Sequence, residues 1–156
     1  MEGLDIISDI RTLPMFESDS IDLIYASHVI AYFDPREVSL VIDEWKRVIK
    51  SGGILRISTP NLESLIKIYK ITGDINKIIG PLYGRMMLGK ESIYHKQVFD
   101  RTSLVRLLTN CGFSSIAEWD WRETEHSNYD DYSQAFFPHM DKDNGLQVSL
   151  NLEAKK

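Results

Sequence analysis

The feature that most constrains the fold is a strand–helix–strand alternation between residues 21 and 58. Residues 21–26 form a nearly continuous apolar run, which is typical of a strand covered on both faces. From 38 to 49, apolar residues recur at helical spacing, and Gly52-Gly53 is a stop signal for that helix. A second apolar run, residues 54–58, follows at once. This alternation predicts an α/β domain with a parallel sheet and right-handed crossovers.

Further segments extend this α/β pattern along the chain. The helix is expected to begin at the capping signal Asp34-Pro35-Arg36-Glu37. The other predicted elements are a strand over Leu4–Ile10, a helix over Leu62–Thr72, a helix from Asp100 or Thr102 to Gly112, a strand over Phe113–Trp121 and a last, antiparallel strand over Leu146–Ala154. Residues 124–145 are polar, aromatic and acidic, and we expect a lid or long loop there. We find no repeat or linker, so residues 1–156 are expected to form one domain.

Composition excludes several classes of protein. The net charge of -5 argues against a nucleic-acid or anionic-membrane partner. No apolar stretch approaches the roughly 20 residues of a membrane helix. Residues 1–5 have no basic region or long apolar run, so no secretory signal is expected there, and the single cysteine, Cys111, excludes an intrachain disulfide framework. We therefore expect a cytoplasmic protein.

Several sequence segments occur in the order found in one enzyme family. They are Asp9-Ile10-Arg11-x-Leu13-Pro14, then D-S-I-D-L-I-Y-A-S-H-V-I, then E-W-K-R-V-I-K-S-G-G-I-L-R-I-S-T-P, and later H-K-Q-V-F-D-R-T-S-L-V-R-L-L-T-N-C-G-F. Together they resemble class I S-adenosylmethionine-dependent methyltransferases, most closely the type 11 group. The resemblance implies a Rossmann-like mixed sheet with strand order 3-2-1-4-5-7-6 and an antiparallel last strand. It also implies S-adenosylmethionine as cofactor and a small-molecule acceptor.

The resemblance further implies a fold truncated at its N-terminus, with family strands 3–7 present and strands 1–2 absent. In the family, the first strand ends in a G-x-G-x-G loop, because only glycine lets the backbone approach the cofactor closely. The second strand ends in an acidic residue that binds the ribose. No two of the nine glycines in this chain are separated by one residue. We therefore expect an incomplete cofactor site and a chain that is inactive or weakly active by itself.

The resemblance also assigns candidate site residues. Asp9 and Ile10 match the adenine-binding position, although a surface turn is the alternative for Asp9. Ser27 and His28 follow a strand at the sheet edge where ligands bind, and they are candidate cofactor contacts. His28 matches a position beside the reactive centre, where a neutral imidazole could take a proton from the acceptor. The alternative is a histidine hydrogen-bonded in a loop. The candidate acceptor-binding residues are Tyr32, Tyr94 and His95. No metal site is expected.

Two functions from different classes remain open. The first is a methyltransferase of small molecules. The second is a non-catalytic methyltransferase-like domain for binding or assembly, favoured by the missing glycine loop and by Ala31-Tyr32, where the family has an acidic residue and a histidine. Without family strand 1, residues 21–26 would be an exposed edge that attracts another strand. Either residues 4–8 move into that place or a second copy pairs there across a two-fold axis, and we predict a homodimer.

Overall fold

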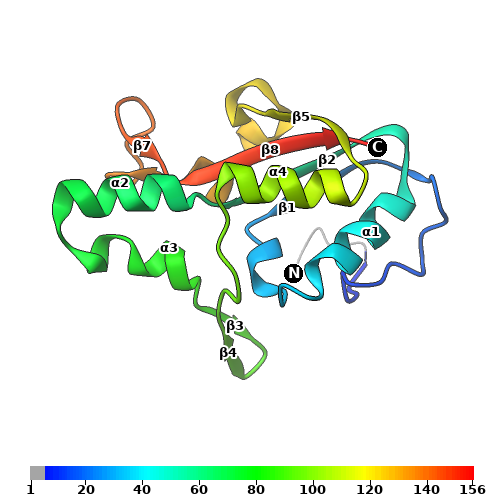
Figure 1. The fold of residues 1–156 in the computed structure, drawn as a ribbon, viewed down its shortest axis with the longest axis horizontal. Helices are drawn as coiled ribbons and strands as arrows, with labels where there is room; N and C mark the ends of the chain where they lie inside the picture. The colour runs from blue at the N-terminus through cyan, green and yellow to red at the C-terminus, as the bar shows by residue number, and fades with distance from the viewer. Residues whose placement is uncertain (1–5) are drawn as a thin grey trace.

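The computed structural model describes residues 6–156, which form an α/β fold around one mixed sheet. Its strand order is β1-β2-β8-β5 (Figure 1). β1 (Ile21–Ser27) is parallel to β2 (Ile49–Pro60), whereas β8 (Ser149–Lys155) is antiparallel to both β2 and β5 (Ser114–Glu118). In the family's strand numbering, these four strands are 4, 5, 7 and 6, in that order, and the antiparallel strand lies in the expected place. The predicted mixed α/β sheet is therefore confirmed.

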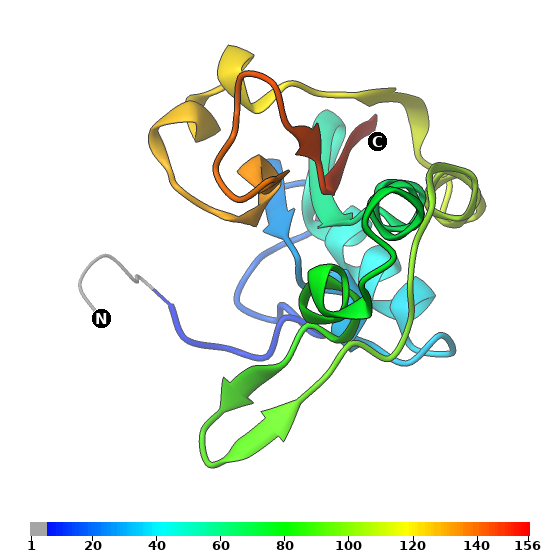
Figure 2. The same cartoon turned by 90° about the vertical axis from the view of Figure 1, so that its left-hand side faces the viewer.

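The remaining elements surround this sheet. They are α1 (Val38–Val48), α2 (Leu62–Thr72), α3 (Ile79–Tyr83), β3 (Met86–Leu88), β4 (Glu91–Ile93), α4 (Arg101–Asn110), β6 (Phe136–Phe137) and β7 (Leu146–Gln147). β3 and β4 form a hairpin that extends away from the rest of the fold (Figures 1 and 2). Within residues 6–156, no helix has both the length and the apolar character needed to cross a bilayer.

The two faces of the sheet are covered differently. Alternation along the strands places Leu55, Ile57 and Leu152 on one face, where they are fully buried in a core with α1 and α4. The opposite face is covered by residues 119–137, which contain short 3-10 turns (Figure 2). There, the His126 ring stacks on Tyr25 at a centroid distance of 3.7 Å. The segment predicted as a lid or long loop therefore includes a covering layer of the sheet.

Local capping sets the ends of two predicted helices. At α2, the Asn61 side chain accepts a hydrogen bond from the Glu63 amide, and Gly73 ends the helix in a left-handed conformation. At α4, Asp100 and Ser103 form a reciprocal capping box. Both helices are confirmed, and Asp100 is the cap of α4.

The start of α1 differs from the prediction. Residues 35–37 form a turn and the helix begins at Val38. The Asp34 carboxylate accepts a hydrogen bond from the Arg36 amide at 2.9 Å, a bond typical of a tight turn. The Glu37 side chain does accept from the Asp34 amide at 3.2 Å, so half of the predicted capping box is present. The sequence signal therefore marked the turn that leads into the helix.

Strand β2 begins five residues earlier than predicted and includes the glycine pair. Ile49 pairs with Ile21, and the register then shifts so that Leu23 pairs with Ile54. A Cβ on Gly53 would lie only 2.9 Å from the Asp22 carbonyl oxygen, so this close approach requires glycine. Gly52-Gly53 thus forms an irregularity inside a strand, because pairing with β1 continues across it.

The predicted first strand is wrong over residues 6–10, which are irregular; residues 4 and 5 lie outside the described part. The segment that follows is bonded to α1 by polar contacts. The Trp45 Nε1–H donates to the Ile10 carbonyl at 2.8 Å, and the Leu13 amide donates to Glu44 Oε1 at 2.7 Å. Residues 6–16 therefore add no strand to β1, and β1 is an edge strand of the described sheet.

Candidate functional site

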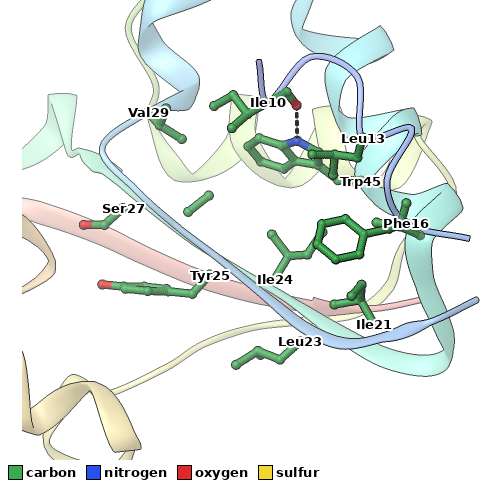
Figure 3. A pocket seen from close by; sticks show the side chains of 12 residues that line it. Ile10, Leu13, Phe16, Ile21, Leu23, Ile24, Tyr25, Ser27, Val29 and Trp45 are labelled. Carbon is green, nitrogen blue, oxygen red and sulfur yellow. Dashed lines mark hydrogen bonds between the residues drawn. The ribbon is translucent and has the colours of Figure 1, made fainter. Parts of the chain in front are cut away.

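An apolar cavity of about 530 Å³ follows the free edge of β1 (Figure 3). Ile24 points toward Leu13, Phe16 and Trp45, while Leu23 points to the opposite side of the strand. The lining extends from Ile21 to Ser27, the full length of β1. The cavity therefore runs along the strand edge, and Ser27 and Val29 line it at the carboxyl end of β1.

The candidate cofactor residues are only partly brought together. Ile10 and Ser27 line this cavity together with Val29. Asp9 is exposed, and its carboxylate accepts a hydrogen bond from the Arg11 amide at 3.0 Å. The alternative interpretation of Asp9, a residue that starts a turn, thus describes its conformation here.

His28 occupies an unusual position directly after β1. Its φ of +52° is uncommon for a residue with a side chain, and its amide donates to the Ser58 carbonyl at 2.8 Å. Its Nε2 lies 3.0 Å from Ser149 Oγ. Burial lowers the pKa of His28 to about 4, and the charge of His95 also lowers it. The negative charge of Asp131 has the opposite effect and raises this pKa. The imidazole is therefore neutral at pH 7 and able to accept a proton.

The candidate acceptor residues Tyr32 and His95 pack together near His28. Their rings meet edge to face at a centroid distance of 4.6 Å. The Tyr32 hydroxyl donates to the Gly84 carbonyl, and His95 Nδ1 lies 3.3 Å from the Leu82 carbonyl. Tyr94, by contrast, is exposed after the β3–β4 hairpin. The structure thus joins two of the three predicted acceptor residues.

A second cavity, of about 550 Å³, lies between the α2–α3 region and residues 130–140. Asp131 and Tyr132 line it. The Asp131 carboxylate accepts from the Tyr25 hydroxyl at 2.6 Å, and the Tyr132 ring lies 5.4 Å from that of His28. Tyr25 lines the first cavity, so the Tyr25–Asp131 bond connects the walls of the two cavities. His28 lines neither cavity and contacts the second through Tyr132.

Sequence reasoning missed most partners of His28. In sequence, Tyr132 is one residue of an aromatic, acidic segment, with no signal that connects it to His28. Ser149 and Asn151 looked like ordinary polar positions of an alternating strand, 121 residues or more from His28. No local signal connects residues so distant, because antiparallel pairing of β8 with β2 brings them to the site. Within residues 6–156, no three histidine, cysteine, aspartate or glutamate side chains gather as a metal site would need.

The cavity beside β1 fits only part of S-adenosylmethionine. Its apolar walls around Ile10 and Val29 suit an adenine ring, whereas Asp9, next to Ile10 in the chain, is exposed and lies outside the wall. In the described residues, however, the wall includes no glycine and no acidic side chain. The backbone approach to the methionine end and the contact with the ribose, both expected of the family, are not supplied by residues 6–156. The chain's own residues therefore fit the adenine end of the cofactor alone.

Comparison with known proteins identifies a matching domain model and similar folds. A family model described as a methyltransferase domain matches residues 3–57. Among solved structures, a S-adenosylmethionine-dependent methyltransferase from Methanosarcina mazei is 22% identical, with a TM-score of 0.55 over 96% of this chain and 65% of that one. One from Archaeoglobus fulgidus is 18% identical, with a TM-score of 0.54 over 97% and 66%.

A third solved structure, described as a possible histamine N-methyltransferase from Thermotoga maritima, is 15% identical, with a TM-score of 0.55 over 96% of this chain and 62% of that one. No curated protein sequence matches the chain. At these identities the structures show the fold alone. The chain spans 62–66% of the length of the three proteins. The resemblance to class I methyltransferases is confirmed by the domain match and the shared fold.

Proposed function

We propose that this chain, which has the fold and domain of S-adenosylmethionine-dependent methyltransferases, takes part in methyl transfer to a small-molecule acceptor. The observation that carries the proposal is His28, a neutral imidazole that directly follows the carboxyl end of the parallel strand β1 and packs on Tyr132, a wall residue of the second cavity. Ligands of open α/β sheets bind at this edge. The chain spans less than two thirds of its solved relatives, so a complete active site in this chain is not part of the proposal.

In this proposal the first cavity takes the adenine end of the cofactor. Ile10 and Val29 enclose the ring, and Ser27 faces the next part of the ligand. We assign the exocyclic amine to Asp9, the exposed neighbour of Ile10 in the chain. When bound, S-adenosylmethionine would supply an electrophilic methyl group. In this proposal, His28 accepts a hydrogen bond, and then the proton, from the group that receives the methyl.

The second cavity takes the acceptor. Its wall combines aromatic and carboxylate side chains, including Asp131, Tyr132 and Phe136. Such a wall suits a small molecule with an apolar body and a hydroxyl or amine group. Tyr32 and His95 would border the acceptor from the opposite side, and Tyr94 would contact it only if the β3–β4 hairpin approached the site.

A non-catalytic role in binding or assembly is the second candidate. The cavity beside β1 is lined by six of the seven residues of that strand, which is about 23 Å long at roughly 3.3 Å per residue. An adenine ring occupies only a fraction of that length. The remaining apolar wall suits a protein partner, and we propose a second copy of this chain, paired along β1 across a two-fold axis.

The cofactor proposal is tested with S-adenosylhomocysteine as the probe, followed by saturation-transfer NMR on its adenine protons. We expect binding in the millimolar range, because only the adenine end meets fitting residues. Asp9→Ala should weaken binding about fivefold, since one hydrogen bond contributes on the order of 1 kcal/mol. Asp22→Ala is the matched control, because Asp22 is an exposed carboxylate of β1 that pairs with Lys50.

The outcomes separate the two candidates. Adenine signals that weaken in Asp9→Ala and persist in Asp22→Ala support the cofactor site. No signal at millimolar probe, or equal signals in the parent and Asp9→Ala, would contradict it and leave the non-catalytic role as the better candidate.

A further inference from the structure

A chain of three hydrogen bonds connects His28 to the segment that covers the sheet. His28 Nε2 lies 3.0 Å from Ser149 Oγ. The Ser149 hydroxyl is 2.8 Å from Asn151 Oδ1, and Asn151 Nδ2 is 3.0 Å from the Ser133 carbonyl. Ser149 and Asn151 are each only 5% exposed, so water does not compete for these bonds.

The last bond in the chain determines the direction of the others. A backbone carbonyl can only accept, so the Asn151 amide must present its NH₂ group to Ser133 and its oxygen to Ser149. That oxygen can only accept, so the single hydroxyl proton of Ser149 is donated to Asn151. Ser149 Oγ then has only lone pairs to offer His28. The neutral imidazole must therefore carry its proton on Nε2.

We propose that Ser149 and Asn151 are positioning residues that hold His28 as the Nε2-protonated tautomer, with the lone pair of the neutral ring on Nδ1. A role of this lone pair toward a methyl acceptor rests on the proposed function, whereas the tautomer rests on the three hydrogen bonds. The Tyr132 backbone, which also accepts a hydrogen bond from this ring, competes for the same proton. With the opposite tautomer, Nδ1 would donate and could not accept the acceptor's proton.

The test is long-range ¹H–¹⁵N NMR of the uniformly labelled chain, which distinguishes the two imidazole tautomers. The signals of His28 are assigned by their loss in His28→Asn. We expect the Nε2–H form to dominate in the parent chain at pH 7. Asn151→Ala should shift the ring toward the Nδ1–H form, because the freed Ser149 hydroxyl can then donate to Nε2. Ser149→Ala should remove the preference, and Ser149→Thr, which keeps a hydroxyl, should retain it.

Gln147→Ala is the control for a merely structural effect. Gln147 Nε2 also donates to the Ser133 carbonyl, at 2.9 Å, but has no part in the chain to His28. Its loss should leave the tautomer unchanged. A parent chain dominated by Nδ1–H, or folded Asn151→Ala and Ser149→Ala variants with an unchanged tautomer, would overturn the proposal. Because no probe is present in this experiment, failure of the cofactor proposal leaves its result intact.

Discussion

At residue 28, backbone and side chain are constrained by different partners. The left-handed backbone is held by the bond from the His28 amide to the Ser58 carbonyl, whereas the ring is held by Ser149 and packed by Tyr132. Among residues with a side chain, histidine, asparagine and aspartate adopt this backbone region most readily. Such positions persist where the surroundings enforce them, which is common at functional sites.

The lowered pKa of His28 predicts a pH dependence of stability. Its pKa is about 4 in the folded chain and about 6.5 when unfolded, so between these values the unfolded state binds more protons. The free energy of unfolding should therefore fall as the pH falls from 6.5 to 4, by up to about 3 kcal/mol from this group.

His28→Asn removes the titrating group and tolerates the left-handed backbone. Urea unfolding at pH 7 and pH 4.5 should show a smaller loss of stability for this variant than for the parent. His139→Asn, at an exposed position, should behave like the parent. An equal pH dependence in His28→Asn and the parent would exclude His28 as the source.

At the scale of elements, α1 organises the chain that precedes β1. The Glu44 carboxylate accepts from both Arg47 and the Leu13 amide, and these bonds lower the pKa of Glu44 to about 2. Arg47 in turn donates to the Leu13 and Phe16 carbonyls. These contacts hold residues 10–16 against α1 and so form one wall of the cavity beside β1.

Glu44→Gln should loosen this wall. The variant loses the charge that pairs with Arg47 and weakens the bond to the Leu13 amide. Hydrogen exchange at that amide should accelerate about tenfold, since a bond to a charged group contributes roughly 1.5 kcal/mol or more. Asp43→Asn, an exposed acidic position of the same helix, should leave the exchange rate unchanged. Equal rates in Glu44→Gln and the parent would show that apolar packing alone holds the segment.

At the scale of the whole molecule, the described sheet ends at β1, whose edge faces the apolar cavity. An apolar strand with unpaired backbone groups favours pairing with another chain. Pairing of β1 with β1 of a second copy would bury this edge on both chains. We therefore predict a homodimer in solution.

Light scattering after size exclusion at micromolar concentration should give twice the mass of the single chain. Leu23→Glu puts a charge into the proposed interface and should give a monomer. Leu40→Glu makes the same change on the exposed face of α1 and should remain dimeric. A monomeric parent chain, or a Leu23→Glu variant that stays dimeric, would contradict this interface.

Much of the architecture could be predicted because its signals are local. Residues 21–26 show their burial directly in sequence, and Asn61, Gly73 and Asp100 mark helix ends through bonds to near neighbours. The start of β2 could not be predicted, because pairing with β1 carries the strand across Gly52-Gly53. The composition of residues 6–10 predicts a strand, but in the structure these residues pair with no strand.

For the candidate site, the sequence determined which chemical groups are present: a histidine after a strand, an aspartate–isoleucine pair and a tyrosine–histidine pair. Tertiary structure alone decided how they are combined. It placed Ile10 in the same cavity as Ser27, joined His95 to Tyr32, left Tyr94 exposed, and brought Ser149 to His28. The physical reason is that caps and hydrophobic periodicity act over a few residues, whereas the site is formed by strand pairing and by polar bonds between segments far apart in the chain.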